Sequence, residues 1–225
     1  MAQESLNRLL ADLHAERVRT WDPAQLKGNI DQRALLVATA DRAGFVQVGD
    51  GVAGFNLEEV GGELLALDRL VEEGPVVLIF FRYAGCPACN IALPYYQRNL
   101  AAVVKALGAR LVAVSPQVPE RLVEIKRRHG LTFDVATDRD NALGRRFGIL
   151  FESDAVSQAA AKARGAFIGD TTGTGTGELP MPAVVVIDQD HTVRFAEVSP
   201  DWLVRAEAEP VIAAVEAVLA AVPVE

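Results

Sequence analysis

The stretch VVLIFFRYAGCPACN, residues Val76–Asn90, determines how the rest of this sequence is interpreted. Its apolar run, Val76–Phe81, predicts a buried strand, because a short continuous run of β-branched and aromatic residues suits a strand covered on both faces. Residues 82–85 predict a turn, and CPAC at residues 86–89 then opens a helical pattern. The chain has no other cysteines. A CxxC pair at a strand–helix junction therefore predicts a chemical site as well as a packing element.

Strands and helices alternate regularly after this stretch. Such alternation is typical of βαβ units, in which parallel strands form a sheet with helices on both faces. A hairpin of two strands, 183–187 and 193–198, follows, and a helix from about Pro210 to Ala221 closes the chain. We expect an α/β fold with a central mixed sheet flanked by helices. The predicted elements between CPAC and the hairpin are strand 110–115, helix 119–129, strand 132–137 and helix 139–147.

Two segments depart from this rhythm. Residues 3–19 carry apolar residues at helical spacing, and Asp22-Pro23 is a typical start for a second helix, which ends near Ala40. We therefore predict an N-terminal helical extension, residues 1–44, in front of a domain of residues 45–225. Between strands, residues 154–163 predict a helix, and the glycine–threonine run at 171–177 predicts a mobile linker.

Composition and charge exclude several functions. The formal net charge of −8 argues against a nucleic acid or an anionic membrane as partner. The N-terminal residues carry charges throughout, unlike a secretory signal, and the longest apolar run is too short to span a bilayer. These features predict a cytoplasmic protein. The sequence contains no phosphate loop, nucleotide fingerprint or metal motif, so we expect no cofactor.

The spacing of the two cysteines favours redox chemistry. Pro87 suits the first turn of a helix, which places Cys86 at the N-cap and Cys89 one turn inside, deeper and less exposed. A helix N-terminus stabilises a thiolate, and the permanent charge of Arg82 adds to this effect. The pKa of such a thiol falls from about 8.5 toward ~3.5–7.5. We predict Cys86 as the nucleophile and Cys89 as the resolving thiol.

The cysteine pair allows two other interpretations. A closed zinc site needs four ligands, and His14, His129 and His191 are scattered without ligand spacing, so no metal is expected. The cysteines could also be two inert buried thiols. Redox function is favoured over both, because a strand, a turn and a CxxC-bearing helix in a βαβ setting are typical of a redox motif.

At these residues the sequence resembles the thioredoxin-like superfamily. Pro94 matches the kink proline of the thioredoxin helix, and Met181-Pro182 matches the superfamily's cis-proline. More closely, residues 48–218 resemble the alkyl hydroperoxide reductase/thiol-specific antioxidant family, and within it the bacterial peroxiredoxin-like proteins with a CPxC motif. The matching pieces, in the family's order, are VGDGVAGFNL, VVLIFFRYAGCPACN, ARLVAVSPQ, LTFDVATDRDNALGRRFGI and LPMPAVVVIDQDHTVRFAEVSPD.

Several positions depart from the family's pattern. Peroxiredoxins typically have Thr or Ser three residues before the peroxidatic cysteine, where this chain has Tyr83, whose phenol can donate a hydrogen bond. They also have an arginine just before the strand at 183–187, where Pro182 stands. Arg82 is the expected replacement cation near Cys86, and Arg194 of the hairpin is a weaker candidate.

The thioredoxin pattern is also incomplete. The buried aspartate of thioredoxin lies six residues before its first cysteine, where this chain has Phe80. Gly85 stands where thioredoxin has its flanking tryptophan. The chain thus matches neither a standard peroxiredoxin nor a standard thioredoxin.

The resemblance implies two enzymatic functions that the residues alone leave open. One is an antioxidant thiol peroxidase, in which Cys86 reduces a hydroperoxide, Cys89 forms a disulfide with it, and an external dithiol of the thioredoxin type restores both thiols. The other is a thioredoxin-like protein-disulfide oxidoreductase, in which Cys86 attacks a partner's disulfide. A third hypothesis is a redox-sensing, partner-binding protein with little turnover. Many relatives dimerise, so the resemblance makes a homodimer one option and leaves the oligomeric state open.

Overall fold

The computed structural model describes residues 4–221, and its centre is a seven-stranded mixed sheet with the strand order β2-β1-β5-β4-β3-β8-β9. The central strand β3 pairs in parallel with β4 and antiparallel with β8. The strands are β1 Asn56–Glu59, β2 Leu64–Ala66, β3 Val76–Phe80, β4 Arg110–Ser115, β5 Asp134–Thr137, β8 Ala183–Ile187 and β9 Val193–Val198, with a separate pair formed by β6 Leu150–Glu152 and β7 Glu178–Pro180.

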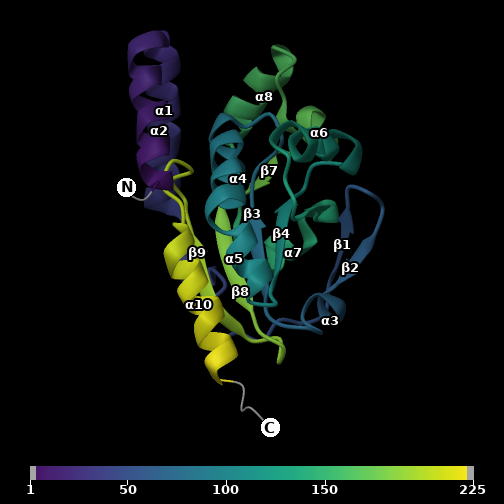
Figure 1. Cartoon of the computed structure of the whole chain (residues 1–225). Coiled ribbons are helices and arrows are strands. Elements are labelled where there is room, and N and C mark those ends of the chain that lie inside the picture. Colours follow the sequence, from purple (N-terminus) through teal and green to yellow (C-terminus); the bar gives the residue numbers. More distant parts are fainter. Residues whose placement is uncertain (1–3, 222–225) are drawn as a thin grey trace.

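Helices lie on both faces of this sheet, as the sequence predicts (Figure 1). The face that carries α4 is the more heavily covered, and α1, α5, α6 and α10 also contribute to its core. The helices are α1 Leu6–Thr20, α2 Pro23–Thr39, α3 Leu67–Leu70, α4 Pro87–Asn99, α5 Ala101–Ala106, α6 Pro119–His129, α7 Ala142–Arg146, α8 Ala155–Ala163, α9 Ile168–Thr172 and α10 Ala208–Ala221. None of the helices within residues 4–221 is both long and apolar enough to cross a membrane.

Strand β3 holds the two layers together because every residue in it is buried. Side chains alternate between the faces of a strand, so its apolar run supplies both cores at once. Val77 and Ile79 belong to the core under α4, and Val76, Leu78 and Phe80 belong to the core on the opposite face. This double burial explains why the run is continuous rather than alternating.

The N-terminal helix α1 is part of the core rather than a loose appendage. Leu6 and Leu10 are fully buried and pack in the cluster that contains α4. The carboxylate of Glu207 holds the start of α1, accepting hydrogen bonds from the backbone N–H groups of Leu6 at 2.8 Å and Asn7 at 3.0 Å. The boundary at residue 44 remains a prediction, but α1 is structurally continuous with the main core.

Helix α2 is attached differently, since none of its residues is buried. Asp22 caps its start as the sequence predicts, with Oδ1 2.9 Å from the backbone nitrogen of Ala24. Arg33 on α2 forms a two-pronged ion pair with Asp201, both contacts being 2.7 Å. This pair links α2 to the segment between β9 and α10.

Two predicted elements differ from the structure. The helix expected over residues 139–147 begins only at Ala142, because Asp140 and Asn141 adopt positive φ angles of 58° and 55°. The carboxylate of Asp138 then accepts the first helical N–H groups. In the segment expected to be a mobile linker, residues 171–177, the first two residues end α9 and the others connect α9 to β7; the backbone N–H of Val118 donates to the carbonyl of Thr172 at 2.9 Å. This part of the chain is thus built into the fold.

Truncation of Leu10 tests whether α1 belongs to the core. We expect Leu10→Ala to lower the free energy of unfolding by about 2–5 kcal/mol, because it leaves a cavity in packed structure. Leu35→Ala on α2 is the matched control, since Leu35 is 57% exposed and its loss should change stability by less than about 0.5 kcal/mol. Denaturant unfolding measures both values. Equal, small effects of the two substitutions would contradict the packing of α1.

Candidate active site

The cysteine pair lies where β3 passes into α4. Cys86 is the N-cap of α4, Pro87 occupies its first turn, and Pro94 lies inside it, as predicted from the sequence. The Sγ atom of Cys86 accepts a hydrogen bond from the backbone N–H of Cys89 at 3.4 Å. A sulfur in this position meets the unsatisfied N–H groups and the positive end of the helix dipole.

Burial of the two cysteines differs from the expectation. Both side chains are 0% exposed, so the prediction that Cys89 is less exposed than Cys86 is wrong. The reason is that segments distant in the sequence cover the turn: Leu10 of α1 and Trp202 belong to the same buried cluster as the two thiols. The position of a cysteine along α4 therefore does not determine whether its thiol is accessible to solvent.

Arg82 contacts Cys86 directly. Its Nη2 lies 3.2 Å from the Sγ of Cys86, which bears out the expectation of a cation beside this thiol. The guanidinium stacks over the ring of Trp202, with its Cζ 4.6 Å from the ring centre, and also lies 5.7 Å from the ring centre of Tyr83. The two aromatic rings thus hold a permanent positive charge beside the sulfur.

Two further arginines reach the site from opposite ends of the chain. Arg205, between β9 and α10, is 4% exposed, and its Nη2 is 3.5 Å from the Sγ of Cys89. Arg17 on α1 is 5% exposed, and its charge acts on Cys86. Within residues 4–221, no carboxylate forms an ion pair with Arg17, Arg82 or Arg205. The positive charge of this cluster is therefore directed toward the thiols.

These surroundings separate the pKa values of the two cysteines. Burial opposes ionisation of Cys86, but the hydrogen bond from Cys89 and the charges of Arg82 and Arg205 outweigh it, so the pKa of Cys86 lies well below its ordinary value. Burial and the neighbouring Cys86 thiolate together raise the pKa of Cys89 well above its ordinary value. The two shifts run in opposite directions, so Cys86 loses its proton first and Cys89 keeps its proton to higher pH.

A polar network fixes the turn that carries Cys86. The side-chain oxygen Oε1 of Gln117 accepts the backbone N–H of Ala84 at 2.8 Å. The amide of Asn90 donates to the carbonyls of Ala84 at 2.7 Å and Cys86 at 2.9 Å. The hydroxyl of Ser115 donates to the carbonyl of Arg82 at 3.0 Å. These hydrogen bonds fix the positions of Cys86 and Arg82 relative to each other.

The other predicted site residues differ in how close they lie to the cysteines. Tyr83 is half-buried at the site, and burial raises the pKa of its phenol. Arg194 does not reach the cysteines, because its Nε pairs with Asp188 in the hairpin at 2.5 Å. Pro182 lines a small hollow together with Arg205.

The prediction of a cis bond before Pro182 is wrong. Among residues 4–221 no peptide bond is cis, so the bond between Met181 and Pro182 is trans. The chain enters β8 already extended: Pro180 ends β7, and the backbone N–H of Met181 donates to the carbonyl of Ile149 at 2.7 Å. The backbone thus reaches the strand without a sharp reversal.

Sequence reasoning missed Arg17 and Arg205. The sequence does contain a signal for Arg17. It follows Leu6, Leu10 and Leu13 at helical spacing, so it lies on the apolar face of α1. A charged residue is rarely buried on such a face without a partner or a function. Arg205 had no comparable signal. Its place depends on contacts such as that of its backbone N–H with Asn7 Oδ1 at 2.9 Å, which joins the two ends of the chain.

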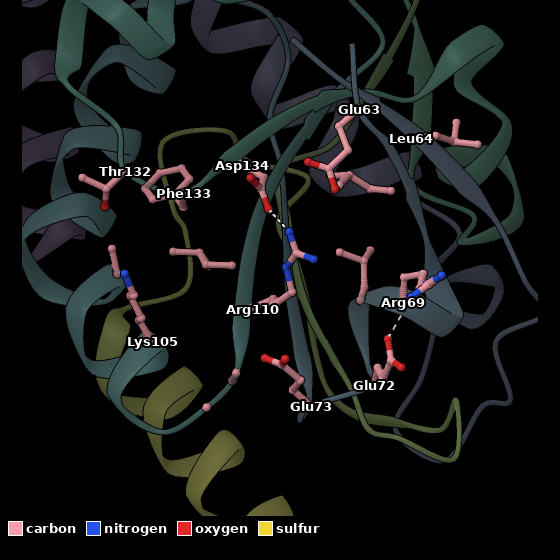
Figure 2. A pocket seen from close by; sticks show the side chains of 16 residues that line it. Glu63, Leu64, Arg69, Glu72, Glu73, Lys105, Arg110, Thr132, Phe133 and Asp134 are labelled. Atoms are coloured by element: carbon pink, nitrogen blue, oxygen red, sulfur yellow. Dashed lines mark hydrogen bonds and ion pairs between the residues drawn. The ribbon is translucent and has the colours of Figure 1, made fainter. Parts of the chain in front are cut away.

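A surface hollow of about 670 Å³ lies away from the cysteines. Figure 2 shows it lined by Arg110 and Asp134, which pair with each other at 2.8 Å at the starts of β4 and β5. Cys86 instead follows the opposite end of β3, so neither cysteine lines the hollow. Within residues 4–221, no cluster of three or more His, Cys, Asp or Glu side chains is arranged to hold a metal ion.

A dithiol at the N-terminus of a helix, with an arginine in contact with each sulfur, is typical of a thiol-dependent oxidoreductase. The sequence of residues 48–196 matches the AhpC/TSA family. The chain belongs to this family, which makes it a thiol-dependent oxidoreductase. A comparison with curated proteins gives no match.

Solved structures confirm the thioredoxin-like fold expected from the sequence. Peroxidoxin BcpB from Mycobacterium tuberculosis is similar with a TM-score of 0.59 and 21% identity, over 77% of this chain and 98% of that one. A peroxiredoxin-like protein from Aquifex aeolicus gives 0.60 and 15% identity, over 77% and 88% of the two chains. Peroxiredoxin Q from Xanthomonas campestris gives 0.56 and 18%, over 73% and 91%.

Removal of the charge beside Cys86 tests the electrostatics of the site. We expect Arg82→Met to raise the pKa of Cys86, because the charged form loses its nearest cation while the side-chain stem still packs. Arg194→Met is the control, since Arg194 pairs with Asp188 elsewhere. Thiolate absorbance followed against pH measures both variants. A pKa of Cys86 unchanged by Arg82→Met would refute the assignment.

Proposed function

We propose that Cys86 is the peroxidatic nucleophile of a cycle that Cys89 completes. The observation that carries this proposal is the 3.2 Å contact between Arg82 Nη2 and Cys86 Sγ at the start of α4. The thiolate attacks the terminal oxygen of a hydroperoxide, the O–O bond breaks, and the leaving oxygen takes a proton to become an alcohol or water. Cys86 becomes a sulfenic acid.

Cys89 is the resolving thiol in this proposal. While Cys86 is a thiolate, its negative charge helps to keep Cys89 protonated. Oxidation to the neutral sulfenic acid removes that charge, while Arg205 remains 3.5 Å from Cys89 Sγ. The pKa of Cys89 then falls, and its thiolate attacks the Cys86 sulfur to form a disulfide and release water. The change of charge at Cys86 thus activates the second step.

An external dithiol of the thioredoxin type restores both thiols. Its thiolate attacks the disulfide, and its second thiol releases the reduced pair. Because both cysteines are fully buried, this exchange requires the turn or α1 to move aside. A reducing compartment such as the cytoplasm suits a cycle that depends on free thiols. A homodimer remains a proposal that the peroxidase chemistry does not need.

A protein-disulfide oxidoreductase is the second candidate. Tyr83 and Pro182 stand where peroxiredoxins have a hydroxyl residue and an arginine, and CPAC serves disulfide exchange equally well. Insulin reduction by the protein, with Cys86→Ser as control, separates the candidates: turnover that depends on Cys86 would favour the second one. Slow kinetics with both substrates would favour the redox-sensing hypothesis instead.

Rapid oxidation by hydrogen peroxide tests the peroxidase cycle. We expect the reduced protein to react much faster than a free thiol, Cys86→Ser to abolish this phase, and Cys89→Ser to retain it but accumulate a sulfenic acid. Stopped-flow fluorescence, with Trp202 4.6 Å from the Arg82 guanidinium, reports the reaction. A dimedone adduct followed by mass spectrometry detects the sulfenic acid. A rate equal to that of a free thiol would contradict the proposal.

A further inference from the structure

The arginines of this site offer more donors than the thiols use. Arg82 directs Nη2 to Cys86, but its Nε is buried without a hydrogen-bond partner within residues 4–221. Arg17 is 5% exposed, and its Nη1 also has no hydrogen-bond partner within the described residues. A buried guanidinium N–H without an acceptor is costly, so its presence needs an explanation.

The charge balance points the same way. Arg17, Arg82 and Arg205 carry three positive charges, and no carboxylate of residues 4–221 forms an ion pair with them. Arg205 is occupied, since it donates to Cys89 Sγ and to the carbonyl of Trp202 at 3.2 Å. The excess charge and the open donors therefore belong to Arg17 and Arg82.

Arg17 comes from outside the segment that matches the AhpC/TSA family, residues 48–196. It lies on the face of α1 that packs against α4, and its guanidinium lies 4.6 Å from the ring centre of Trp21. Figure 1 shows α1 beside α4. The extension therefore adds a third guanidinium, beside those of Arg82 and Arg205, from outside the segment that matches the family.

We infer that Arg17 and Arg82 bind an anionic group of the substrate, and that the preferred oxidant is a hydroperoxide that carries a carboxylate. This inference rests on the proposed peroxidase function and names its substrate class. The carboxylate accepts the free N–H groups of the two arginines while the O–O bond meets Cys86. The reaction balances as before: the thiolate, the hydroperoxide and one proton give a sulfenic acid and the corresponding hydroxy acid. Arg17 acts as a specificity-determining residue.

A matched pair of peroxides tests this inference. A short-chain hydroperoxy carboxylic acid and its methyl ester have the same O–O bond and differ in charge. We expect the reduced protein to react with the acid about tenfold faster than with the ester, in keeping with hydrogen bonds to a charged group. Arg17→Gln should bring this ratio close to one, and Arg17→Lys should keep part of it. Because a shift in the pKa of Cys86 alters both rates alike, the ratio isolates recognition of the carboxylate.

Arg19→Gln is the matched control, since Arg19 lies two residues along α1 but is exposed. It should leave the ratio unchanged, and thermal unfolding of all variants confirms that they fold. Equal rates for acid and ester, or a ratio that Arg17→Gln does not change, would overturn the inference while leaving the peroxidase cycle intact. Failure of the unsubstituted protein to react with either peroxide would overturn the proposed function, and the inference with it.

Discussion

A thiolate without solvent exposure is the constraint on which this structure depends. Moving a charge out of water is costly unless opposite charge and hydrogen bonds replace the lost hydration. At Cys86 the replacement comes from the N-terminus of α4 and from the guanidiniums of Arg82 and Arg205. Since the pKa of Cys86 is lower in the folded state, its ionised form stabilises the fold above the unfolded-state pKa. This contribution is lost as the pH falls through the folded-state pKa.

The ends of the chain fold together to meet this constraint. Glu207 accepts hydrogen bonds from the start of α1, and Asn7 donates to the carbonyl of Arg205 at 2.9 Å. These hydrogen bonds join the helix that carries Arg17 to the loop that carries Arg205. Pro182 stands where peroxiredoxins typically have an arginine. Arg17 and Arg205, from the two flanking segments, supply positive charge in its place.

Much of the scaffold could be predicted because its signals are local. The strand at β3, the cap of α4 by Cys86 and the helix α6 each follow from periodicity, burial or a capping residue within a few positions. Arg82 was also predictable, because it lies four residues before Cys86.

The remaining features depend on contacts between distant residues. Cys86 is buried in a cluster with residues of α1 and with Trp202, and the bond before Pro182 is trans although the sequence resembles a cis-proline motif. Asp140 and Asn141, with positive φ, shorten a helix whose sequence pattern is continuous. Such features are set by packing that periodicity does not encode.

The central claim is that the arginines hold one cysteine of a buried pair as a thiolate and leave the other protonated. Titration of the thiolate absorbance of the reduced protein tests this claim most directly. The account predicts two separate steps, one well below and one above the value of about 8.5 for an ordinary cysteine. A single step for both thiols at or above that value would contradict it.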